Sequence, residues 1–239
     1  MKPQGFFITG TDTDIGKTVV TACLLALYRK HQRSVGVMKP FETGVDPECS
    51  SAANSDAKFL MEIARCPDDL SLISPVRLKP AASPYQAAKM ENRPIQVDSI
   101  LHSFQTLADK YQNMLVEGVG GLMVPIAENY LICDLVRDLG LPLLVVSRNA
   151  LGTLNHTLLT LKVAKQEGIH VCGVLLNRTQ PGEPDEIEKG HAKIISEFSG
   201  VPVLGEIPFI GNVSEGSFSG KLLDRLEESL DLDLLWPKR

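Results

Sequence analysis

Residues 10–18 read GTDTDIGKT and follow the apolar run GFFIT, an order that is typical of a phosphate-binding loop. Five residues separate Gly10 from Gly16, whereas the common P-loop has four between its glycines. Backbone N–H groups at the start of the following helix would converge on phosphate oxygens, with Lys17 on the terminal phosphates and the Thr18 hydroxyl on Mg²⁺. A plain glycine turn does not require Lys and Thr directly after its glycine, so the stretch predicts nucleotide binding.

Charged residues follow two further apolar runs. Lys39 and Thr43 lie in VMKPFETG, and Glu117 lies in LVEGVGG. A lone loop lysine is usually solvated, but a second cation on the same rim as the phosphate loop suits stabilisation of a transferred phosphoryl group. Glu117 at a strand end is a candidate Mg²⁺ ligand, and taken alone it fits a helix cap or a solvated acid equally well. Asp56 in NSDA is a second candidate, and its alternative role is to cap the helix that follows.

Three later segments contain possible binding groups with simpler alternatives. Asn177 in LLNRT suits a hydrogen bond to a base edge and Pro208 in LGEIPF suits a wall for the ring, although turn formation explains both equally well. The helix opening LGTLNHT at 151–157 suits a carboxylate, although a plain N-cap is the simpler explanation. His156 has no partner histidine or cysteine nearby, so we expect no metal there.

Short apolar runs alternate along the chain with stretches of helical spacing, which predicts an α/β fold. The pattern indicates a doubly wound, mostly parallel sheet flanked by helices, as in P-loop NTPases, and one domain over residues 1–239. The expected strands are 6–9, 34–38, 114–116, 141–147 and 171–177. The expected helices are 17–31, 56–65, 97–111, 130–139, 151–167, 183–198 and an amphipathic terminal helix over 221–236.

Composition narrows the class of partner. The formal net charge is −5 and no basic run occurs, so we expect no nucleic-acid partner. The longest apolar run, at 141–147, is too short to span a bilayer, and the N-terminus lacks a signal sequence, so we expect no membrane association. The five cysteines show no CxxC spacing, which indicates reduced thiols and a cytoplasmic location.

Taken in order, the stretches GTDTDIGKT, KPFETG, NSDA, VEGVGG, LGTLNHT and GEIP resemble the dethiobiotin synthetase family over residues 5 to about 210. The long G-x5-GKT loop is similar to that family's own version of the P-loop. The resemblance implies ATP as co-substrate, Mg²⁺ as cofactor, and 7,8-diaminononanoate and CO₂ as the molecules that are joined. It also implies a homodimer with the substrate site near the interface.

The resemblance implies a role for each matching position. Lys17 and Lys39 would be catalytic, because they would neutralise the γ-phosphoryl group as it moves. The implied metal ligands are Thr18, Asp56 and Glu117. The nucleotide would contact Asp14, Ile15, Gly16, Lys17, Thr18, Val19, Asp56, Glu117, Gly118, Val119, Gly120, Asn177, Arg178 and Pro208. The diamine would contact Thr43, Leu151, Gly152, Thr153 and Asn155.

The chain departs from the family at three of these positions. Asp14 stands where the family often has Glu, Val119 where it often has Ala, and Arg178 where some members have Asp. The first two changes are conservative, whereas Arg178 beside the base pocket leaves the choice between ATP and CTP open.

Two other nucleotide-dependent classes compete with this interpretation. An amide-forming ligase on a cobalamin precursor would need a glutamine-hydrolysing domain, for which 239 residues leave no room. A partitioning-type regulatory ATPase would carry a further lysine early in its loop, where this chain has Thr11, Asp12 and Thr13. Dependence of turnover on a diamine would exclude the regulatory class.

Overall fold

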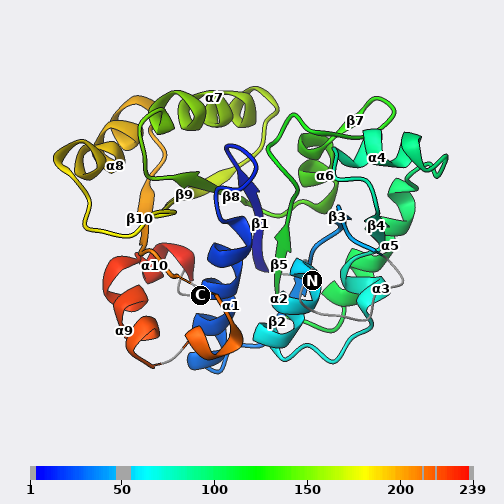
Figure 1. Ribbon diagram of the computed structural model, residues 1–239, viewed down its shortest axis with the longest axis horizontal. Helices are drawn as coiled ribbons and strands as arrows, with labels where there is room; N and C mark the ends of the chain where they lie inside the picture. The colour runs from blue at the N-terminus through cyan, green and yellow to red at the C-terminus, as the bar shows by residue number, and fades with distance from the viewer. Residues whose placement is uncertain (1–3, 47–54, 212, 219, 237–239) are drawn as a thin grey trace.

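The computed structural model describes residues 4–46, 55–211, 213–218 and 220–236 and is built around a parallel sheet (Figure 1). Six strands lie in the order β10-β9-β8-β1-β5-β2, and each neighbouring pair is parallel. They are β1 (Gln4–Gly10), β2 (Val35–Met38), β5 (Asn113–Glu117), β8 (Leu143–Arg148), β9 (Val171–Asn177) and β10 (Val203–Ile207). Helices cover the sheet on both faces, which explains why its central strands are continuous apolar runs. The predicted doubly wound α/β class is confirmed.

The helices lie in layers on the two faces of this sheet. In Figure 1, α7 and α8 pack together along the top, while α1 packs against α9 below. The helices are α1 (Lys17–Lys30), α2 (Asp56–Ala64), α3 (Leu70–Ile73), α4 (Pro84–Met90), α5 (Val97–Ala108), α6 (Ile132–Leu139), α7 (Thr153–Gln166), α8 (Glu186–Ser199), α9 (Gly220–Ser229) and α10 (Leu232–Leu235). Among the described residues, none of these helices is long and apolar enough to cross a bilayer.

Two small sheets lie beside the main one. Strands β3 (Phe41–Thr43) and β4 (Val76–Leu78) pair in parallel, and β6 (Pro125–Ala127) and β7 (Tyr130–Leu131) pair antiparallel. The expected helix at 130–139 is therefore wrong in its first turn, because Tyr130 and Leu131 are extended. The helix begins at Ile132, and the backbone N–H of Leu131 donates to Asp134 Oδ2 at 2.7 Å.

The predicted single terminal helix at 221–236 is also wrong. The chain breaks between α9 and α10, where Leu230 forms a bridge with Gly205 of β10. The backbone N–H of Asp231 donates to Leu204 O at 2.7 Å, and the Asp231 side chain caps α10 by accepting from the Leu234 N–H at 3.1 Å. Pairing with β10 therefore replaces continuation of the helix at this point.

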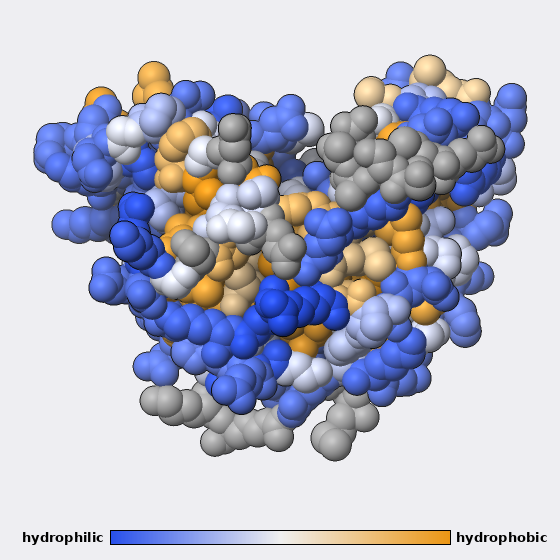
Figure 2. Space-filling model, turned by 60° about the horizontal axis from the view of Figure 1, so that its bottom comes forward, coloured by the Kyte–Doolittle hydropathy of each residue, from blue (hydrophilic) through white to orange (hydrophobic). Residues whose placement is uncertain are grey.

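Two further features are the polarity of one face of the molecule and the state of the cysteines. Viewed with its bottom turned forward, the molecule is mostly hydrophilic around its outline, with hydrophobic side chains visible towards the centre (Figure 2). Cys23, Cys66, Cys133 and Cys172 are free thiols, and Cys49 lies outside the described residues.

Candidate active site

The phosphate loop runs from the end of β1 to the start of α1 and contains two residues in the left-handed region. Asp14 has φ 55° and Gly16 has φ 87°. Aspartate tolerates this conformation better than most side chains do. A Cβ on Gly16 would lie 2.1 Å from Asn177 Nδ2, so the close approach of β9 demands glycine here as well. The second loop glycine is therefore fixed by both conformation and space.

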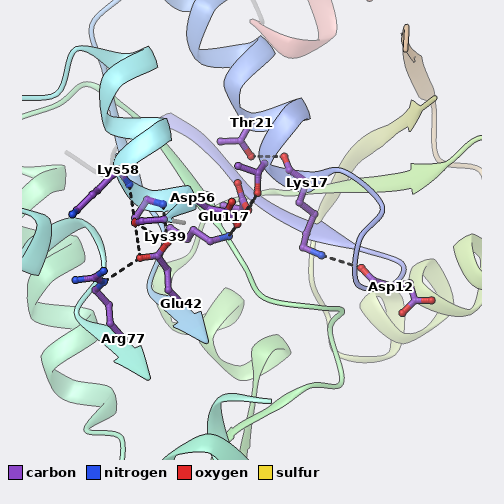
Figure 3. Close-up of polar contacts among 12 residues, drawn as sticks. Asp12, Lys17, Thr21, Lys39, Glu42, Asp56, Lys58, Arg77 and Glu117 are labelled. Carbon is purple, nitrogen blue, oxygen red and sulfur yellow. Dashed lines mark hydrogen bonds and ion pairs between the residues drawn. The ribbon is translucent and has the colours of Figure 1, made fainter. Parts of the chain in front are cut away.

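Lys17 is the first residue of α1, and its ammonium bonds to the loop itself. Its Nζ donates to the backbone oxygen of Asp12 at 2.9 Å, and only 8% of the residue is exposed (Figure 3). Burial lowers the pKa of Lys17, the charge of Glu117 opposes this, and Lys39 adds to the lowering. A phosphate anion in the loop would offer this ammonium a stronger acceptor than a neutral carbonyl.

Four side chains from four different elements meet beside the loop (Figure 3). Lys39 Nζ lies 2.5 Å from Glu117 Oε1 and 3.2 Å from Asp56 Oδ2. The Thr18 hydroxyl lies 2.8 Å from the same Glu117 oxygen and 3.1 Å from the same Asp56 oxygen. Lys39 follows β2, Glu117 ends β5, Asp56 begins α2 and Thr18 is in α1, so the parallel strand ends bring these groups together.

Lys39 stays charged in this cluster although it is buried. Burial pulls the pKa of Lys39 down, but the charges of Glu117 and Asp56 outweigh this and the pKa is raised. Glu117 is 1% exposed, and its Oε2 has no hydrogen-bond partner within the described parts of the chain. An unpartnered buried carboxylate oxygen is costly unless a cation or a donor approaches it.

The oxygen donors of this cluster fit Mg²⁺. Mg²⁺ is usually bound by one or two carboxylates together with substrate phosphates and water. Thr18, Asp56 and Glu117 supply a hydroxyl and two carboxylates next to the phosphate loop, and Glu117 has a free oxygen to offer. These three residues would hold the ion, in agreement with the sequence-based expectation.

A cavity of about 510 Å³ opens onto this cluster. Most of the expected site residues line it, namely Asp14, Gly16, Lys17, Thr18, Lys39, Thr43, Asp56, Glu117, Gly118, Val119 and Gly120. Thr43 is half-buried in β3, the strand that forms one wall. The cavity therefore joins the phosphate loop to the KPFETG segment, as their order along neighbouring strands predicts.

The residues expected to contact the base lie outside this cavity. Asn177 is 2% exposed, and its Nδ2 donates to the backbone oxygen of Ile15 at 2.8 Å. Arg178 and Pro208 line a second cavity of about 460 Å³, which lies between the segment after β9, the end of β10 and α9. Val19 is half-buried and packs against the core. Of these residues, Asn177 is the one that contacts the phosphate loop, through Ile15.

Arg178 lies between two acids in this second cavity. Its guanidinium lies 3.4 Å from both Glu188 and Glu206, and the side chain is 10% exposed. The two acidic groups beside Arg178 come from α8 and β10.

The expected carboxylate subsite at the start of α7 lines neither cavity. Leu151 is 90% exposed, and Gly152 is the N-cap with φ 93° and no side-chain hydrogen bond. Thr153 faces inward, where its hydroxyl lies 2.7 Å from Ser147 Oγ. Within this chain, Leu151, Gly152 and Asn155 are exposed.

Comparison with known proteins agrees with this geometry. A family model described as an AAA domain matches residues 4–217. The ATP-dependent dethiobiotin synthetase BioD of Thermodesulfovibrio yellowstonii is 40% identical over 218 residues, which cover 88% of this chain and 91% of the relative. The chain belongs to the dethiobiotin synthetase family. The BioD of Bacillus subtilis (strain 168), another dethiobiotin synthetase, is 36% identical over 95% of this chain and 96% of its own length.

Solved structures agree at the level of the fold. A ParA family ATPase from Chlorobium tepidum TLS matches with a TM-score of 0.52 over 100% of this chain and 95% of that chain. Its sequence identity is 16%, so the match shows a shared P-loop NTPase architecture and nothing about the reaction. The chain combines this architecture with the sequence motifs of the dethiobiotin synthetases.

Sequence reasoning missed one buried acid of this dethiobiotin synthetase site. Glu42 lies in β3 between Phe41 and Thr43, lines the cavity and is 4% exposed. Its carboxylate accepts from Ser55 Oγ, from the backbone N–H of Ala57 and from Arg77 Nε. The sequence evidence for Glu42 is an acidic residue inside KPFETG. Its spacing does not distinguish a buried acid from a solvated loop residue.

Proposed function

We propose that the protein is an ATP-dependent dethiobiotin synthetase that joins CO₂ to 7,8-diaminononanoate and closes the ureido ring, releasing ADP and phosphate. The observation that carries this proposal is the single cavity in which Lys17 and Lys39 meet the Thr18, Asp56 and Glu117 cluster. The named relatives, which are similar along nearly their whole length, support the same reaction.

The reaction has three bond-forming steps. One amine of the diamine attacks CO₂ and loses a proton, which gives a carbamate. A carbamate oxygen then attacks the γ-phosphorus of ATP, and the bond to the ADP oxygen breaks. The second amine attacks the carbamoyl carbon of this mixed anhydride, phosphate leaves with the bonding electrons, and loss of a proton completes the ring.

This chemistry needs positioning and neutralised charge more than a protein nucleophile. Lys17 would leave the Asp12 carbonyl, 2.9 Å away, and bind the terminal phosphates. Lys39 remains protonated because its pKa is raised, so it can stabilise the charge of the phosphoryl group during transfer. When bound by Thr18, Asp56 and Glu117, Mg²⁺ would add positive charge beside these lysines.

The diamine would extend from the cavity towards a second copy of the chain. Thr43 lines the cavity, whereas Leu151 at the start of α7 is exposed and Gly152 does not line the cavity. A single protomer therefore does not enclose a long substrate between the cavity and the start of α7. A homodimer in which the α7 start of one protomer faces the cavity of its partner would complete the site, and it would cover Leu151, which is 90% exposed. The free thiols suit a cytoplasmic enzyme.

The test is phosphate release from the purified protein with MgATP and bicarbonate, with and without 7,8-diaminononanoate. We expect release only with the diamine, together with dethiobiotin detected by mass spectrometry. Equal release without the diamine would contradict the synthetase proposal and favour a regulatory ATPase. Replacing ATP by CTP in the same assay measures the base preference, and equilibrium sedimentation measures the dimer.

A further inference from the structure

Glu42 connects the substrate wall of the cavity to the start of α2. Its carboxylate accepts from the Ser55 hydroxyl at 3.1 Å and 3.0 Å and from the Ala57 backbone N–H at 2.9 Å (Figure 3). The first N–H groups of a helix have no partner within the helix, so a buried carboxylate is a favourable acceptor for them. Glu42 therefore fixes the beginning of α2 against β3.

The two residues that Glu42 holds lie on either side of Asp56. Ser55 is the N-cap of α2, with its Oγ accepting from the Lys58 N–H at 3.2 Å, and Ala57 follows Asp56 in the first turn. The Asp56 side chain is itself 55% exposed, so few packing contacts restrain it. Its direction towards Thr18 and Lys39 follows from where the helix begins.

Glu42 is held in place from its other side. Arg77 Nε, from β4, donates to Glu42 Oε2 at 3.2 Å, and the Glu42 residue is 4% exposed. The guanidinium balances the buried charge, which would otherwise be costly. The carboxylate is thus a rigid, fully hydrogen-bonded anchor and is not free to bind the metal itself.

We infer that Glu42 is a positioning residue for Mg²⁺, which acts by holding Asp56 at the correct place for the ion. The inference rests on the proposed function only in taking MgATP as the ligand. Outer residues that orient metal ligands typically change metal affinity 10–100-fold when they are replaced. A role limited to helix capping would lower stability and leave the Mg²⁺ requirement unchanged.

The experiment is a titration of Mg²⁺ against binding of a non-hydrolysable ATP analogue by calorimetry, without diamine. We expect Glu42→Gln to need about tenfold more Mg²⁺ for half-maximal binding. Asp56→Asn should show a shift at least as large. The matched control is Glu62→Gln, which removes an exposed acid from the same helix and should match the wild type.

An unchanged Mg²⁺ requirement in Glu42→Gln would overturn the inference, whether or not the unfolding midpoint of this variant is lower. If Glu42→Gln does not fold, Ser55→Ala removes the hydroxyl link to α2 while keeping Glu42 and its bond from the Ala57 N–H, and it should shift the Mg²⁺ requirement in the same direction. Failure of the wild type to turn over the diamine would refute the proposed reaction without affecting this titration.

Discussion

Replacing Lys39 by methionine tests whether Lys39 holds together the charge cluster beside the phosphate loop. Lys39 is 7% exposed and pairs with Glu117 at 2.5 Å and Asp56 at 3.2 Å. Methionine keeps most of the volume but leaves two carboxylates facing each other. The variant should lose turnover and stability together, and Mg²⁺ should restore stability but not turnover.

The size of the stability loss follows from the burial of the pair. Removing one partner of a buried ion pair costs about 3–5 kcal/mol. Glu117 keeps its hydrogen bond from the Thr18 hydroxyl, and Asp56 is 55% exposed, so we expect the lower end, about 3 kcal/mol. For a domain of this size that corresponds to a drop of about 6–12 °C in unfolding midpoint.

The assay is urea and thermal unfolding of Lys39→Met and wild type, each with and without Mg²⁺. Lys193→Met, which removes an exposed lysine of α8, is the control and should change stability by less than about 0.5 kcal/mol. The raised pKa of Lys39 means that its contribution is fully present below the ordinary value of 10.5 and is lost only as pH rises through the higher folded pKa. The difference from wild type should therefore be constant from neutral pH up to 10.5. A variant as stable as wild type without Mg²⁺ would refute the reasoning.

Three further changes test the loop and the α7 start. Gly16→Ala should abolish nucleotide binding measured by calorimetry, because its Cβ would meet Asn177 Nδ2 at 2.1 Å in a left-handed conformation. Lys17→Met should also lose nucleotide binding yet unfold no more easily at neutral pH. Burial lowers the pKa of Lys17, so its ammonium opposes folding below that pKa and the opposition fades as pH rises towards 10.5. Circular dichroism melts at a series of pH values should show stability rising with pH in this range for the wild type and not for Lys17→Met. Ser147→Ala should cost about 1–3 kcal/mol in urea unfolding, because the Thr153 hydroxyl loses a buried partner at 2.7 Å.

The sequence predicted the central strands well because they are buried on both faces. The run 114–116 became β5 (Asn113–Glu117) with small changes at its ends, and the run 171–177 became β9 (Val171–Asn177). Strand β10 was not predicted as a strand, because Gly205 and Glu206 interrupt its apolar run and its pairing is decided by β9. Long-range pairing of this kind leaves little local signal.

The candidate site was predictable where chemistry depends on residue type at a strand end. Lys39 and Glu117 were predicted on that basis, and the structure places Lys39 Nζ 2.5 Å from Glu117 Oε1. Asp56 was predicted from the NSDA stretch at the start of a helix, and its Oδ2 lies 3.2 Å from Lys39 Nζ. Their binding roles stay predictions. Glu42 was missed because its importance comes from contacts with Ser55 and Arg77, which lie 13 and 35 residues away.

The bridge between Leu230 and Gly205 has a consequence for aggregation through the edge of the main sheet. Strand β10 is at one end of the main sheet, and an uncovered edge strand is a template on which another chain can add. The segment between α9 and α10 occupies part of that edge, with the Asp231 N–H on Leu204 O at 2.7 Å. The segment that joins the last two helices therefore protects part of this edge strand from pairing with another chain. A chain cut short before Leu230 should precipitate on heating at temperatures where the full chain stays in solution.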